Sequence, residues 1–89
     1  MDTAYIGESF ESFYEVSDTR DPTRTPTEAY YSVYVGGELV NGGKMVISGK
    51  EISFRFEPTR AGVHDIVIQY KIGSDTWKKP FQINVVDIG

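Results

Sequence analysis

Residues 63–72 of this 89-residue chain read VHDIVIQYKI, and this stretch decides the fold class. His64, Ile66, Ile68, Tyr70 and Ile72 fall on one face, and most of the residues between them are polar. A period of two residues is that of a β-strand with one face buried. No segment repeats apolar residues at helical spacing over three turns. We therefore predict a strand over Val63–Ile72 in an all-β protein.

The same alternation recurs on both sides of this strand. It predicts further strands at Glu8–Val16, Glu28–Val35, Glu38–Val40, Lys44–Ser48, Glu51–Glu57 and Trp77–Ile88. Gly36-Gly37, Gly42-Gly43 and Gly49-Lys50 separate neighbouring strands, and glycine tolerates the positive φ of tight hairpin turns. The polar segment Asp18–Thr27, with two prolines, is expected to be a loop.

About seven short strands in one domain spanning residues 1–89 favour an antiparallel β-sandwich, with an open barrel as the alternative. Pro80 has no N–H for a sheet ladder, so we expect a bulge or an edge position there. Alternation also predicts which side chains point inward. They are Phe10, Tyr14, Val16, Tyr31, Val33, Ile52, Phe54, Phe56, Ile66, Ile68, Tyr70, Phe81, Ile83 and Val85.

Composition excludes several kinds of site. The chain has no cysteine and one histidine, so a thiolate or multi-histidine metal centre cannot form. No apolar run is long enough to span a bilayer. The net charge of −4 argues against general binding to nucleic acid or to an anionic membrane. We expect no cofactor and no metal.

Acidic residues gather in the first third of the chain. Residues 1–28 contain seven of them against Arg20 and Arg24, whereas the remainder is nearly balanced. An acidic edge strand followed by a solvated polar loop explains this distribution. The alternative is an acidic patch that steers a basic partner.

The run from Pro58 to Tyr70 resembles a segment of bacterial and phage immunoglobulin-like modules, in which a Pro-x-x-Ala-Gly-x-Tyr run leads into the penultimate strand. Gly7-Glu8-Ser9-Phe10 and the closing residues 81–86 also look like such modules. The resemblance implies an immunoglobulin-like sandwich without catalytic residues. It also implies companions such as phage tail, neck, baseplate and capsid-decoration proteins and bacterial surface proteins. His64 departs from the pattern, because the family usually has Tyr there.

Two groups of residues could carry chemistry, and a structural role explains each better. His64 is expected to face inward beside a backbone partner, and no nucleophile motif accompanies it. Asp18, Asp21 and Asp75 invite a calcium interpretation, but their spacing matches no calcium loop and Arg20 lies among them. We therefore predict that the protein is not an enzyme.

Three aromatic residues form the candidate protein-binding site. Tyr30 and Tyr34 alternate with the inward residues of their strand, so both should lie on its outer face. Phe13 is also predicted to point outward, on another strand. Tyr is a common anchor of protein interfaces. A loop or a bulge that covers these rings is the alternative, and stacking on a glycan is a third.

These observations predict a non-enzymatic structural or interaction module. The leading hypothesis is a virion protein of a phage head, neck or tail, located in the virion or the host cytoplasm, that binds another structural protein or itself. The alternative is a module of a bacterial surface or carbohydrate-active protein, acting as a spacer or glycan binder at the cell surface.

Overall fold

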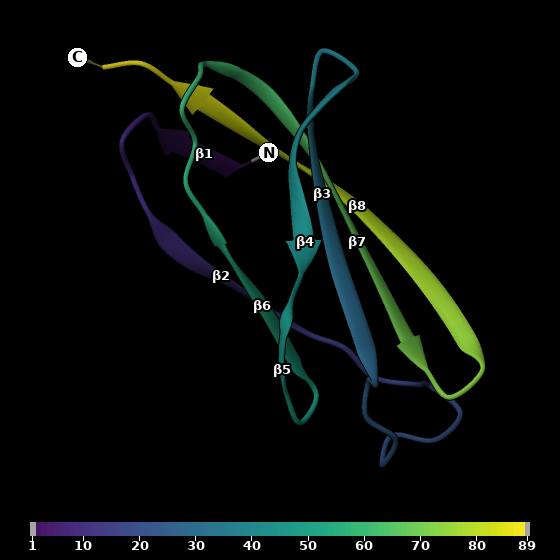
Figure 1. Ribbon diagram of the computed structural model, residues 1–89. Coiled ribbons are helices and arrows are strands. Elements are labelled where there is room, and N and C mark those ends of the chain that lie inside the picture. Colours follow the sequence, from purple (N-terminus) through teal and green to yellow (C-terminus); the bar gives the residue numbers. More distant parts are fainter. Residues whose placement is uncertain (1, 89) are drawn as a thin grey trace.

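The computed structural model describes residues 2–88, which form eight strands in two facing sheets (Figure 1). The strands are β1 (Asp2–Tyr5), β2 (Phe10–Glu15), β3 (Glu28–Val35), β4 (Glu38–Lys44), β5 (Val46–Ser48), β6 (Glu51–Phe56), β7 (Gly62–Ile72) and β8 (Asp75–Val86). One sheet has the order β1-β8-β7-β3-β4, and the other has the order β2-β6-β5. All pairs are antiparallel except β1 with β8.

This arrangement confirms the predicted β-sandwich. β3, β7 and β8 lie side by side as strands C, F and G do in an immunoglobulin-like sandwich, and β2, β6 and β5 form the opposing B, E, D sheet. The first described strand joins the last one instead of joining β2. Among the described residues no helix is long and apolar enough to cross a bilayer.

The core lies between the sheets and follows the predicted alternation. The inward residues of the sequence prediction are buried, except that Phe10, Tyr14, Tyr31 and Phe81 are half-buried against the core. Tyr31 stacks on Phe54 across the two sheets, with ring centroids 4.2 Å apart. The core also includes Ala4, Ala29, Met45 and Ile72, which the predicted inward set did not contain.

Two expectations about strand boundaries are wrong. Gly42-Gly43 is not a turn but part of β4, and the predicted strand Lys44–Ser48 is divided between the two sheets at Met45. Gly42 allows close approach of the two strands, because a Cβ there would lie 3.0 Å from the backbone oxygen of Tyr31. Met45 is buried, and its N–H donates to the carbonyl of Ala29 at 2.9 Å as the chain changes sheets.

β1 was not predicted, because only Ala4 of its four residues is buried and so alternation is barely visible. It pairs with β8 only from Ile83 to Val86. β8 therefore has a free edge at Pro80, which matches the expected edge position.

Gly36-Gly37 and Gly49-Lys50 are turns as predicted, and Gly36 and Gly37 both have positive φ.

The long loop after β2 is fixed by a buried carboxylate. Asp18 exposes 1% of its side chain and accepts hydrogen bonds from the backbone N–H of Arg20 and from Arg24 Nη1, both at 2.9 Å. Arg24 Nη2 also donates to the carbonyl of Ile72 at 2.9 Å, while Arg20 pairs with Asp75. The loop is thereby tied to the β7–β8 turn, which lies beside it in Figure 1.

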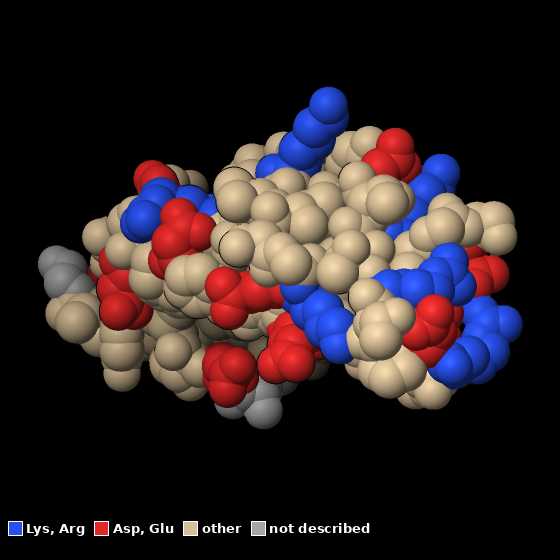
Figure 2. Space-filling view, turned by 90° about the horizontal axis from the view of Figure 1, so that it is seen from below, with Lys and Arg blue, Asp and Glu red and all other residues tan. Residues whose placement is uncertain are grey.

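Charges of both signs are consequently mixed at this end of the sandwich. Figure 2 views the molecule from below, and blue and red side chains intermingle at the right of that view, beside an uncharged central area. Gly73 in the turn faces the Arg24 guanidinium so closely that a Cβ there would clash with Nη2. Asp18 and Asp75 therefore form ion pairs with arginines of the same chain. Among residues 2–88, no group of three or more acidic or histidine side chains is placed to hold a metal ion.

Acid should weaken this attachment. The backbone N–H of Arg20, followed by the two guanidinium groups, holds the pKa of Asp18 below its usual value. A lowered folded-state pKa gives stability that is present above the unfolded pKa of about 3.9 and is lost as the pH falls through the folded value. Urea unfolding of the wild type and of Asp18→Asn should therefore show a smaller drop in unfolding free energy below about pH 4 for the variant. Equal acid sensitivity would contradict this role.

Candidate protein-binding face

Tyr30 and Tyr34 lie on the outer face of the five-stranded sheet, as predicted. Their neighbours in β3, Ala29 and Val33, expose 3% and 2% of their surface and point to the core. Tyr30 is 37% exposed and Tyr34 is partly exposed. The facing inferred from alternation is thus confirmed, whereas the binding role of the two rings stays a prediction.

Apolar side chains from the adjacent strands surround the two rings. Val67 in β7 lies opposite Ser32, so it is the diagonal neighbour of both tyrosines. Leu39 in β4 lies directly opposite Tyr34 and is 59% exposed. Pro80 in β8 lies opposite Val67 on its other side. We refer to Tyr30, Tyr34, Leu39, Val67 and Pro80 as the tyrosine face.

Polar residues border this apolar centre. Lys44 and Gln69 flank Tyr30 on the neighbouring strands, and Asp65 lies beside Tyr34. The amide of Gln82 donates to Asp65 at 2.8 Å, which holds one side of the border in place. An apolar centre within a polar rim is the usual anatomy of a protein interface.

Phe13 points outward as predicted but belongs to the other sheet. It is 58% exposed and lies opposite Ser53 of β6, whose other neighbour is Val46 of β5. Phe13 and Val46 flank Ser53, which is only 7% exposed. Phe13 is therefore separated from Tyr30 and Tyr34 by the thickness of the sandwich. Alternation fixes which side of its strand a residue occupies, but it does not say to which sheet the strand belongs.

His64 is buried near the end of the sandwich where β7 begins. It is 2% exposed, its Nδ1 lies 3.1 Å from the carbonyl oxygen of Gly62, and its ring meets Phe56 edge-on at 5.8 Å. Among the described residues, no Ser, Thr, Asp or Glu side chain is hydrogen-bonded to it, as a general base would require. The structure thus gives His64 the backbone partner expected from the sequence.

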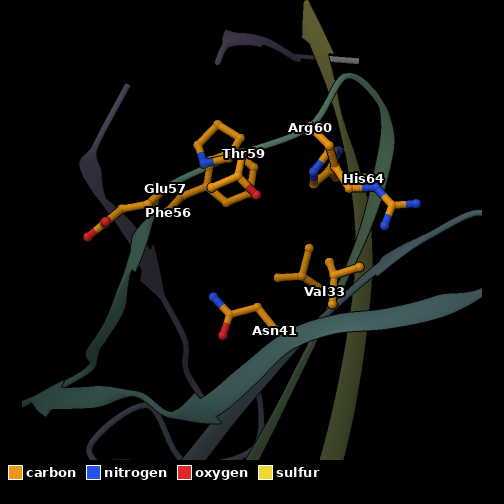
Figure 3. Close-up of a pocket in the computed structure, with 9 residues that line it drawn as sticks. Val33, Asn41, Phe56, Glu57, Thr59, Arg60 and His64 are labelled. Carbon is orange, nitrogen blue, oxygen red and sulfur yellow. The ribbon is translucent and has the colours of Figure 1, made fainter. Parts of the chain in front are cut away.

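A cavity of about 190 Å³ lies beside His64, between β4 and the segment joining β6 to β7 (Figure 3). Val33 and Phe56 form its inner wall, and Asn41, Thr59 and Arg60 surround its mouth. It is close to the size of one large side chain. Its polar groups come from β4, from β7 and from the segment between β6 and β7, and among the described residues His64 is paired with the carbonyl of Gly62 and not with Glu57 or Thr59 of this cavity.

Comparison with known proteins supports the fold and goes no further. No family model and no curated protein sequence matches this chain. One solved structure that resembles it is the crystal structure of a candidate glycoside hydrolase from Bacteroides vulgatus, with a TM-score of 0.63 and 21% identity. The similarity covers 100% of this chain but only 17% of that protein. At this level of identity it establishes a shared β-sandwich fold.

Substitutions at His64 test its structural role. His64→Ala should lower the unfolding free energy by about 1–3 kcal/mol, because the ring contacts and the hydrogen bond to Gly62 are lost. His64→Tyr should leave the unfolding free energy nearly unchanged. The adjacent cavity can receive the longer ring, and the hydroxyl can donate a hydrogen bond to a backbone carbonyl such as that of Gly62. Chemical denaturation of both variants provides the measurement. A His64→Ala variant as stable as the wild type would contradict a structural role.

Proposed function

We propose that this chain is a non-enzymatic interaction module that binds another protein through the tyrosine face. The observation that supports this proposal is the outward position of Tyr30 and Tyr34 around Val67, within a polar border. Large rings left in contact with water add little to folding. Their burial in a complex contributes about 25 cal/mol per Å² of apolar surface before the costs of association.

The setting of this interaction is proposed from the resemblance to phage and bacterial immunoglobulin-like modules. In that setting the partner is a virion structural protein or a second copy of the chain, located in the virion or the host cytoplasm. A sheet face suits such a partner, because a protein surface can cover several strands at once. Tyr combines large contact area with few rotatable bonds, which keeps the entropic cost of ordering low.

A second candidate function is the alternative that the sequence analysis left open. The similar protein is named as a candidate glycoside hydrolase, and this chain corresponds to a small part of its length. In this alternative the chain is a module of a carbohydrate-active or surface protein, acting as a spacer or as a glycan binder. Tyr30 and Tyr34 would then present flat rings to the apolar faces of sugars.

Site-specific crosslinking separates these functions. A benzophenone amino acid at Ser32, between the two tyrosines, should crosslink a defined protein in the cells that produce this chain. The same group at Ser48, on the other sheet, should not. A panel of polysaccharides tests the second function, which predicts retention of the chain that depends on the two tyrosines. Identical crosslinks from both positions would contradict a binding role for the tyrosine face.

The double substitution Tyr30→Ser with Tyr34→Ser should weaken binding to the crosslinked partner by at least about tenfold, which is about 1.4 kcal/mol. The fold should remain nearly as stable, since both rings lie outside the core. Val46→Ser, an exposed apolar residue on the other sheet, is the matched control and should leave binding unchanged. Tyr31→Ser should instead destabilise the fold, because Tyr31 stacks on Phe54. If the double variant unfolds, the tyrosine face is part of the core.

A further inference from the structure

The two sheets of this sandwich differ in width. The narrower sheet therefore leaves part of the inner face of the wider sheet, near β1 and β8, without a strand opposite it. Five strands face three, and β2 is the last strand of the narrower sheet. Next to it a groove of about 720 Å³ opens between β2 on one side and β1 and β8 on the other. Phe10, Tyr14 and Phe81 line this groove and are only half-buried. The position is that of a fourth strand beside β2.

The backbone of β2 is ready to pair with such a strand. The N–H of Val16 donates to the carbonyl of Lys50 at 2.9 Å, and the pairing of β2 with β6 continues this register. Hydrogen-bonded pairs alternate along an antiparallel ladder, so Ser12 and Tyr14 point their backbone groups toward β6. The backbone groups of Glu11, Phe13 and Glu15 therefore point away from β6, where residues 2–88 supply no strand.

The other free edges are less suited to accept a strand. β4 has a bulge opposite Val33 and Tyr34, and the side chain of Asn41 already accepts the N–H of Gly42 at 2.9 Å. β1 and β5 have only four and three residues. The part of β8 that β1 does not cover contains Pro80, which has no N–H to donate to an added strand. β2 has six residues, and its register with β6 is regular. Bulges and very short strands are common devices that prevent pairing at an edge.

Charge on the outer face of β2 indicates the chemistry of the partner. Glu15 lies directly opposite Glu51, both are exposed, and neither has an ion-pair partner among residues 2–88. Like charges in opposite positions destabilise a sheet, so a cation placed beside them would be favourable. Glu11 is partly neutralised by Arg55 at 3.1 Å. Asp2 and Lys79 also line the groove, and their opposite charges cancel. The acidic charge of β2 therefore remains unbalanced.

The same charges disfavour a second copy of the chain as the occupant. An antiparallel pairing of two β2 strands centred on Phe13 would place Glu11 of each copy opposite Glu15 of the other. Both copies also carry a net charge of −4. A basic segment meets neither obstacle.

We infer that β2 and the groove beside it form an acceptor site for an extended, basic segment of a partner protein. The segment adds a strand to β2 through the backbone groups of Glu11, Phe13 and Glu15. Its alternate apolar side chains enter the groove over Tyr14 and Phe81, and its Lys or Arg residues face Glu15. Main-chain bonds give such a complex its affinity, and the pockets for alternate side chains give it specificity.

Short peptides of defined pattern test this site directly. A fluorescent peptide of alternating valine and lysine should bind the chain at least about tenfold more tightly than one of alternating valine and glutamate, measured by anisotropy at low salt. A peptide of alternating serine and lysine should also bind at least about tenfold more weakly, because it has nothing to place in the groove. Equal binding of the three peptides would overturn the proposal.

Two substitutions at one position separate the backbone from the side chain. Phe13→Pro removes an N–H that points to the free edge and should weaken the valine–lysine peptide about tenfold. Phe13→Ala keeps this N–H and removes only a ring that borders the groove, so it should weaken binding by less than about threefold. If Phe13→Pro does not fold, Ser12→Trp should block the site by filling the groove. Binding that survives Ser12→Trp and a folded Phe13→Pro would refute the site.

Two further measurements address charge and alternative occupants. Glu15→Gln should weaken binding of the valine–lysine peptide, and it should not weaken binding of the valine–glutamate peptide. The double substitution of Tyr30 and Tyr34 with Ser should not affect the peptides, because neither tyrosine lines the groove. Analytical ultracentrifugation of the free protein should show a monomer. A dimer that Phe13→Pro dissociates would assign the edge to a second copy instead of a basic partner.

Discussion

Five strands must bury one face against three, and the rest of the structure depends on this inequality. β7 lies at the centre of the wide sheet, between β3 and β8, and its inward residues Ile66 and Ile68 are almost fully buried. Toward both edges of the wide sheet, fewer residues of the narrow sheet pack against it. On the β4 side a small cavity opens beside His64, and on the β8 side the larger groove opens beside β2. The half-buried rings of Phe10, Tyr14 and Phe81 line this groove, where the narrow sheet ends.

The chain compensates for its small core with attachments at the ends of the sandwich. Met45 carries the chain from one sheet to the other while remaining buried. Asp18, with two arginines, ties the crossing loop to the β7–β8 turn. His64 closes the opposite end through Gly62 and Phe56. A domain of this size buries only about 60% of its unfolded surface, so such polar attachments supply order that a larger core would provide by itself.

Local alternation predicted much of this fold, because a side chain in a strand faces either the core or the solvent. It identified Ile66, Ile68 and Tyr70 as core and placed Tyr30 on an outer face. It could not predict which sheet each strand joins, and for that reason Phe13 was grouped with tyrosines that lie on the other side. The Gly42-Gly43 pair predicts a turn although it lies within a strand, because glycine serves both tight turns and close backbone approach. The burial of Asp18 depends on arginines and a turn far away in the sequence, and no local pattern predicts it.

The central claim is that β2 ends the narrow sheet with its outer edge vacant, and amide hydrogen exchange in the free protein tests it most directly. Backbone amides that donate to β6, those of Ser12, Tyr14 and Val16, should exchange slowly. The amides of Glu11, Phe13 and Glu15 should exchange close to the rate of unstructured peptide, because they meet only water. This alternation of slow and fast amides along one strand is the predicted result. Uniform protection from Glu11 to Val16 would show that another strand already occupies the edge, and it would contradict the account.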